Sequence, residues 1–334
     1  MRRREFISFV GSAATAWPLA GHAQQSAGMK RIAVVHPIVS PETMNEKSET
    51  PFYLGLFTEL RRLGYVEGTN LIVERRSGEG KTERYADAAR ELVFLKPDVM
   101  VVTSSRILAY FREATTTIPI IAITGDPILF GIVSNVSRPE GNITGFSADA
   151  SVEIHGKYLE LLKEIKPSLS KVGLVSPGLS WEPYGRPLRE TSSKLGVSIL
   201  GPALDHPFGE PEFRDVIAAM ASGGADALLV TAAAENFPQR RLIIDLAEKY
   251  RMPAIYPFAD YVKQGGLAAY AVDIRENGTR AAGYVHKILQ GAKVADLPYY
   301  MPTRVQLFLN LKTAKALGLE IPPMLLARAD EVIE

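Results

Sequence analysis

From residue 30 onward, short apolar runs rich in β-branched residues alternate with longer segments in which apolar residues recur every three or four positions. The short runs are typical of buried strands and the longer segments of amphipathic helices. The first predicted strands are Arg31–Pro37, Leu71–Arg75, Asp98–Thr103 and Ile118–Thr124. The predicted helices between them are Pro51–Leu63, Glu83–Leu95 and Ser105–Thr115. Continuous apolar strands separated by helices predict an α/β protein whose parallel sheet is covered on both faces.

The same pattern begins again in the second half of the chain. The runs Val172–Ser176, Ala225–Thr231 and Met252–Phe258 correspond in order to Ile32–His36, Pro97–Thr103 and Ile118–Thr124. Two similar doubly wound lobes explain this repetition better than one long sheet. Chance similarity between generic α/β units is the alternative. The turn-rich segment 138–142 marks the expected boundary between the lobes.

The first 23 residues have the layout of a secretory signal. Three arginines, Arg2 to Arg4, are followed by a mildly apolar stretch that ends at Ala20 and by the small residues of Gly21–Ala23. The stretch is too short to span a bilayer as a helix. Residues 3–7 also resemble the twin-arginine export signature, although Arg2 and Ser8 depart from it. We therefore expect the protein to be exported to the periplasm, to be cleaved after Ala23 and not to span the membrane. The alternative is that this segment is a disordered cationic tail.

Composition narrows the function. The 334 residues carry 38 Lys and Arg against 37 Asp and Glu, so no basic excess favours a nucleic-acid partner. The absence of cysteine excludes disulfides, a thiol nucleophile and Cys-ligated zinc. Neither a G-x-S-x-G elbow nor an H-E-x-x-H motif is present, and the five histidines are scattered. The sequence therefore predicts no catalytic residue, no metal site and no cofactor.

Several segments resemble one family of transport proteins. They are Gly64–Leu71, Thr117–Ile121, Arg138–Gly145, Lys157–Ile165, Tyr256–Phe258 with Gly265–Leu267, Asn310–Gly318 and Leu326–Ile333. Together they are similar to the ABC transporter substrate-binding family that contains tryptophan- and phenylalanine-binding receptors. The likeness covers essentially the whole mature chain, and its motifs are mostly structural.

This resemblance implies a type I periplasmic-binding fold: two Rossmann-like doubly wound lobes that are joined by three crossovers and close on a ligand. It implies crossovers near 142–149, near Asp273 and near 300–304. The first lobe would contain residues 30–147 and 274–299, and the second residues 148–273 and 300–334. The partners implied are a small-molecule ligand and the membrane permease of an ABC importer.

In the first lobe, candidate binding residues follow two predicted strands. Ser104 and Ser105 come after Asp98–Thr103 at the start of a helix, where hydroxyls and free N–H groups favour a carboxylate or phosphate. Each serine alone is equally well explained as a helix N-cap. Thr124 and Asp126 end and follow the next strand. Asp126 is a candidate partner for a ligand ammonium, with a turn-forming role as the alternative.

The second lobe offers Trp181 and Tyr184 in a Gly/Pro-rich segment that reads as a loop. These aromatic residues are candidate walls of an apolar pocket, or else they cover the edge of the lobe's own core. Thr231 and Phe258 end two later predicted strands. Asp273 resembles the acidic residue with which such receptors hold an amino group, and a hinge role is its alternative.

Together these groups predict a zwitterionic ligand, and the simplest is an α-amino acid. The resemblance implies an aromatic or branched aliphatic side chain. An aromatic acid, a urea-like compound and a nucleoside remain open from the sequence. Two other functions stay open as well: a sensor module that passes ligand information to a membrane receptor, and an exported enzyme. The enzyme is disfavoured because no nucleophile–base pair is visible.

Overall fold

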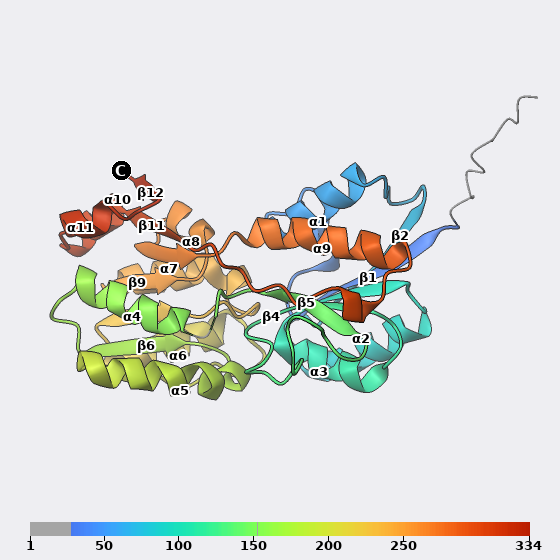
Figure 1. Ribbon diagram of the computed structural model, residues 1–334. Helices are drawn as coiled ribbons and strands as arrows, with labels where there is room; N and C mark the ends of the chain where they lie inside the picture. The colour runs from blue at the N-terminus through green and yellow to red at the C-terminus, as the bar shows by residue number, and fades with distance from the viewer. Residues whose placement is uncertain (1–27, 152) are drawn as a thin grey trace, which may run out of the picture.

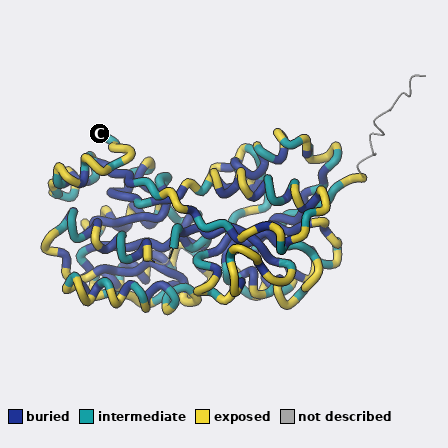
Figure 2. The backbone as a smooth tube through the Cα atoms, in the orientation of Figure 1, coloured by how far each residue is buried: buried dark blue, intermediate teal, exposed yellow. Residues whose placement is uncertain are grey.

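A computed structural model describes residues 28–151 and 153–334. The described chain forms two lobes side by side, each built on a sheet with helices on both faces (Figure 1). Buried backbone is concentrated in the sheets, and exposed backbone on the outer turns of the helices (Figure 2). The predicted signal, residues 1–23, lies outside the described residues. Within the described ranges, no helix has both the length and the apolar character needed to cross a membrane.

The first lobe contains a five-stranded parallel sheet in the order β2-β1-β3-β4-β5. Its strands are β1 (Lys30–His36), β2 (Leu71–Ser77), β3 (Val99–Thr103), β4 (Ile120–Thr124) and β5 (Ile143–Ser147). Every residue of β3, β4 and β5 is buried, as the continuous apolar runs predict. Because the strands are parallel, their carboxyl ends meet at one edge of the sheet.

The second lobe contains a seven-stranded sheet in the order β12-β11-β10-β9-β8-β6-β7. Its strands are β6 (Lys171–Val175), β7 (Ser198–Leu200), β8 (Ala227–Val230), β9 (Ala254–Tyr256), β10 (Ala268–Ala271), β11 (Gln306–Asn310) and β12 (Glu331–Ile333). The pairing of β10 with β11 is antiparallel, whereas the other pairings are parallel.

Helices cover both faces of each sheet through apolar stripes. Those of the first lobe are α1 (Pro51–Arg62) and α9 (Ile274–Leu289) on one face, and α2 (Glu83–Phe94) and α3 (Ser105–Ala114) on the other. Those of the second lobe are α4 (Ile154–Ile165), α5 (Gly178–Leu195), α10 (Leu311–Leu317) and α11 (Pro323–Leu326) on one face, and α6 (Glu210–Ser222), α7 (Arg240–Lys249) and α8 (Ala259–Lys263) on the other. Three short 3-10 turns are η1 (Pro41–Thr43), η2 (Phe237–Gln239) and η3 (Val294–Asp296).

Helix α9 follows the second lobe in sequence but packs on α1 of the first lobe (Figure 1). Glycines make this close packing possible. A Cβ atom on Gly55 would lie 2.3 Å from the carbonyl oxygen of Arg275, and one on Gly278 would lie 2.0 Å from that of Phe52. The two backbones therefore approach to a distance that no larger residue permits. The chain passes between the sheets after β5, before α9 and before β11.

The predicted α/β class and two-lobed architecture are confirmed, and the first-lobe elements end within two residues of their expected limits. One local expectation is wrong: the Gly/Pro-rich segment after β6 is helix α5, with Pro183 and Pro187 inside it. Burial of Tyr184 and Leu188 against the second lobe offsets the missing N–H groups of the prolines. The exact residue limits of the lobes stay a prediction.

Candidate functional site

A pocket lies between the lobes, at the carboxyl ends of their parallel strands. The first lobe contributes residues that end or follow β1, β3 and β4, and the second lobe those that follow β6, β8 and β9. The space between the protein atoms amounts to about 810 Å³, part of which is open to solvent.

The start of helix α3 supplies three polar residues to the pocket. Ser104 is the N-cap, and its hydroxyl accepts a hydrogen bond from the backbone N–H of Arg106 at 3.3 Å. The φ angle of Ser104 is +85°, a conformation that L-residues rarely adopt and that costs about 1–3 kcal/mol at functional sites. Ser105 and Arg106 also line the pocket. Because the N–H groups of a helix start point outward, this corner favours an anionic group.

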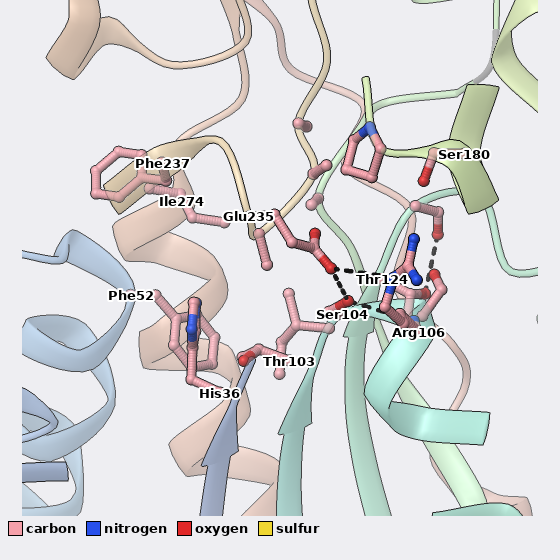
Figure 3. A pocket seen from close by; sticks show the side chains of 18 of the residues that line it. His36, Phe52, Thr103, Ser104, Arg106, Thr124, Ser180, Glu235, Phe237 and Ile274 are labelled. Atoms are coloured by element: carbon pink, nitrogen blue, oxygen red, sulfur yellow. Dashed lines mark hydrogen bonds and ion pairs between the residues drawn. The ribbon is translucent and has the colours of Figure 1, made fainter. Parts of the chain in front are cut away.

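Glu235 enters the same corner from the second lobe (Figure 3). Its side chain is 3% exposed, and its Oε1 accepts a hydrogen bond of 3.0 Å from the Ser104 hydroxyl. The Arg106 Nε atom lies 3.9 Å from this oxygen and has no hydrogen-bond partner among the described residues. Burial raises the pKa of Glu235, while Arg106 and Ser104 act in the opposite direction. The corner thus pairs one buried anion with one partly buried cation.

His36 stands at the end of β1 and also lines the pocket. Its Nδ1 atom accepts hydrogen bonds from the backbone N–H groups of Ile38 and Val39 at 3.0 and 2.9 Å. An imidazole that accepts at Nδ1 carries its proton on Nε2. Burial lowers the pKa of His36 to about 3. The ring is therefore a neutral group at physiological pH and adds no charge to the pocket.

Aromatic and aliphatic side chains form the remaining walls. Phe52 and Phe130 come from the first lobe, and Tyr184, Phe237 and Phe258 from the second. The rings pair edge to face, with centroids 5.6 Å apart for Phe130 and Tyr184 and 5.7 Å apart for Phe237 and Phe258. The pocket has one charged corner and one broad apolar surface.

The lobes touch each other around this pocket. Besides the hydrogen bond between Ser104 and Glu235, the Arg106 guanidinium lies over the ring of Phe208, 4.9 Å from its centroid. Farther out, Arg240 and Glu49 form an ion pair between the lobes at 3.7 Å. These contacts describe a closed arrangement in which residues from both lobes enclose the same space.

The structure brings several predicted residues together and separates others. Those that line the pocket are Ser104, Ser105, Thr124, Tyr184 and Phe258. The Thr124 hydroxyl is already engaged, because it lies 2.6 Å from the Tyr299 hydroxyl and 3.0 Å from the Gly125 carbonyl oxygen. In the first lobe, Ser104, Ser105 and Thr124 therefore lie at the same edge of the sheet.

Four predicted residues lie outside this pocket, each for a local reason. Asp126 and Asp273 cap the backbone that follows them, since each accepts two hydrogen bonds from N–H groups two and three residues ahead. Thr231 is fully buried and bonded to the Val175 carbonyl oxygen. Trp181 packs against the core of the second lobe. The local alternative of each residue, as cap or core, is the one that the geometry favours.

Sequence reasoning missed Glu235 and Arg106. A signal for Glu235 was present: it follows a buried strand and three alanines, with Phe237 two residues later. An isolated acid in such an apolar stretch is seldom fully buried without a partner. Among the described residues there is no group of three or more His, Asp and Glu that would hold a metal ion.

The fold and the pocket define a class of protein: a two-lobed binding receptor that encloses a small molecule between its lobes. Comparison with protein families agrees, because residues 31–333 match the model for ABC transporter substrate binding proteins. The chain belongs to this family. Its members are receptors without enzymatic activity, so the protein is a solute-binding protein of an ABC transporter.

Individual relatives agree with the fold. The chain is 25% identical over 281 residues to the tyrosine-binding protein of Clostridioides difficile, a match that covers 80% of this chain and 76% of the relative. A conserved domain protein from Vibrio cholerae superposes with a TM-score of 0.80 at 25% identity, over 91% of this chain and 99% of that one. An ABC domain in complex with L-Trp from Streptococcus pneumonia superposes with a TM-score of 0.77 at 23% identity, with the same coverage.

Proposed function

We propose that the protein is the periplasmic receptor of an ABC importer and binds an α-amino acid with an aromatic or branched aliphatic side chain. The observation that carries this proposal is the pairing of opposite charges in one corner of the pocket. Arg106 and the start of α3 belong to the first lobe, whereas Glu235 belongs to the second. A ligand that carries both charges satisfies both groups at once, and only in the closed arrangement.

The ligand carboxylate would lie at the start of α3. There it accepts from the Ser105 hydroxyl, from the free N–H groups of the helix and from Arg106 Nε, the buried donor that has no partner in the described chain. Nε2 of His36 offers a further neutral donor. This placement keeps Ser104 and Ser105 as predicted from the sequence, with Arg106 added.

The ligand ammonium would lie against Glu235. A cation beside Glu235 favours the ionised form and so opposes the effect of burial, which raises the pKa of this carboxyl. Glu235 takes the role that the sequence interpretation gave to Asp126 or Asp273, because those two carboxylates are engaged by their own backbone.

The aromatic walls around Phe52, Phe237 and Phe258 would bury the ligand side chain. The names of two relatives, which mention tyrosine and L-Trp, point to the same class of ligand. Export to the periplasm and a membrane permease as partner belong to this proposal and rest on the family and on the predicted signal.

A thermal-shift screen of the mature protein tests the ligand class. The compounds screened are the proteinogenic amino acids, aromatic acids that lack the amino group, and nucleosides. A ligand present at about 100 times its Kd stabilises the protein by about 2.7 kcal/mol. We expect shifts with tryptophan, tyrosine, phenylalanine or the branched aliphatic amino acids. A shift with indole-3-acetate equal to that with tryptophan would contradict the role of Glu235.

A further inference from the structure

One wall of the pocket is anchored to the passage between the lobes. Tyr184, in α5, donates a hydrogen bond of 2.8 Å from its hydroxyl to Oδ2 of Asp149. Both side chains are 2% exposed. Asp149 lies two residues after the end of β5, where the chain leaves the sheet of the first lobe for the second. The hydrogen bond therefore ties a pocket residue to the segment that connects the two sheets.

The Tyr184 side chain fits between the lobes with little space to spare. A Cβ atom on Gly125, in the first lobe, would lie 2.0 Å from the Tyr184 hydroxyl oxygen. The ring packs edge to face with Phe130 of the first lobe, and it also lies against the His155 ring of α4, with centroids 4.4 Å apart. The Tyr184 ring is therefore held between Gly125 and Phe130 of the first lobe and His155 of the second.

The anchor is an unusual choice for a purely structural contact. A buried carboxylate is costly, and an apolar group of the same size is often neutral or stabilising at such a position. Oδ1 of Asp149 is buried and has no hydrogen-bond partner among the described residues. The titratable groups that face Asp149 are His155 and Tyr158 of α4, Tyr184 of α5 and Asp126 of the loop after β4. Burial is the main cause that raises the pKa of Asp149, whereas His155 and Tyr184 oppose it.

We propose that Asp149 is a positioning residue for ligand binding, which acts by holding the Tyr184 hydroxyl so that the ring completes the pocket wall against Gly125 and Phe130. Through this hydrogen bond the passage after β5 and the pocket wall move as one unit when the lobes close. The inference rests on the proposed function in one respect, because the pocket whose wall Tyr184 forms is taken as the ligand site.

A double-mutant cycle on ligand affinity tests this role. The variants are Asp149→Asn, Tyr184→Phe and the double variant, titrated calorimetrically with L-tryptophan and L-tyrosine as probes. A hydrogen bond to a charged group corresponds to a factor of about ten to a hundred in Kd. We expect Tyr184→Phe, which removes the donating hydroxyl, to weaken binding by about this factor. Asp149→Asn retains an oxygen that can accept but loses the charge, so it should weaken binding less. The double variant should bind no more weakly than Tyr184→Phe alone, since Asp149 acts through the tyrosine.

Tyr256→Phe is the matched control, because Tyr256 is a buried tyrosine of the second lobe that does not line the pocket. It should retain wild-type affinity. Effects of Asp149→Asn and Tyr184→Phe that multiply in the double variant would overturn the proposal, because the two residues would then act independently. So would lower thermal stability combined with wild-type affinity, since the hydrogen bond would then serve the fold alone.

A second measurement needs no ligand. Because the chain has no cysteine, Glu113→Cys and Lys194→Cys place one exposed spin label on each lobe. We expect Asp149→Asn and Tyr184→Phe to shift the inter-label distances toward a more open population, whereas Tyr256→Phe should not. If neither amino acid binds the wild-type protein, the proposed ligand class is wrong and the label distances alone test the role of Asp149. Shifted distances would then support the positioning role, and unchanged distances would reject it.

Discussion

Glu235→Gln separates the charge of the ligand-binding carboxylate from its shape. The glutamine retains the size of the side chain, and its amide oxygen can still accept the hydrogen bond of 3.0 Å from the Ser104 hydroxyl. What it removes is the negative charge that lies 3.9 Å from Arg106 and, in our proposal, beside the ligand ammonium. The variant therefore tests electrostatic recognition of the ligand with little change in packing.

The expected loss of affinity follows from the burial of this group. Glu235 is 3% exposed, so solvent does little to screen its interaction with a ligand cation. A hydrogen bond between charged partners contributes about 1.5–3 kcal/mol, which corresponds to about a tenfold to a hundredfold increase in Kd. Amino acids should lose affinity by this factor, whereas analogues without the amino group should bind the variant at least as well as they bind the wild type.

Although Glu235→Gln should weaken ligand binding, it should stabilise the ligand-free protein at neutral pH. Burial raises the pKa of Glu235 above its ordinary value of 4.5. Such a carboxyl stabilises the fold below that value, and this contribution is lost as the pH rises through the folded-state pKa. Glutamine does not ionise, so the Glu235→Gln variant does not lose this stability as the pH rises. Its melting temperature should therefore fall less than that of the wild type between pH 4.5 and pH 8.

Isothermal titration calorimetry and thermal melts over this pH range measure both effects. Glu49→Gln is the matched control, because Glu49 also pairs with an arginine of the other lobe, at 3.7 Å, but its side chain is 93% exposed. Surface pairs of this kind contribute little, so this variant should behave like the wild type. Wild-type amino-acid affinity in Glu235→Gln would refute the reasoning, because the ammonium would then have another partner.

Three further predictions concern other parts of the molecule. Ser105→Ala should weaken amino-acid binding by about tenfold to a hundredfold in calorimetric titrations if its hydroxyl holds the carboxylate, and unchanged affinity would place the carboxylate elsewhere. Gly125→Ala puts a methyl group 2.0 Å from the Tyr184 hydroxyl oxygen, and the overpacking costs about 1–3 kcal/mol. The ligand-induced decrease in radius of gyration, measured by small-angle scattering, should shrink or vanish in this variant. N-terminal sequencing of the protein from the periplasm should give Gln24 as the first residue. A retained N-terminal segment would contradict the predicted cleavage.

The local pattern of the sequence was sufficient for the α/β class, the repeated lobes and the position of Ser104, Ser105 and Thr124 at the carboxyl ends of the first-lobe strands. Strand identity follows from continuous apolar runs, because a strand buried on both faces has no polar side to display. Once the strands are parallel, their carboxyl ends must share one edge of the sheet. Ser104 and Ser105 could therefore be assigned to the pocket from their positions after β3 alone.

Tertiary structure decided which of several similar acids faces the pocket. Asp126, Asp273 and Glu235 all follow strands, and nothing in their neighbouring residues ranks them. The first two accept hydrogen bonds from N–H groups two and three residues ahead, which is a local use of the carboxylate. Glu235 has side-chain partners more than a hundred residues away in sequence. Such a partnership exists only once the lobes have met.

The return of α9 to the first lobe was likewise beyond the reach of periodicity. An amphipathic stripe predicts that a helix is covered on one face, but it does not identify the surface that covers it. The covering surface was decided by Gly55 and Gly278, whose missing side chains let the α1 and α9 backbones touch. The pattern of apolar residues over a short stretch of sequence identifies the helices and strands, because the geometry of each kind of backbone determines which side chains share a face. Contacts between distant residues determine the site, because the energies of charge and close packing depend on atoms that the linear order does not bring together.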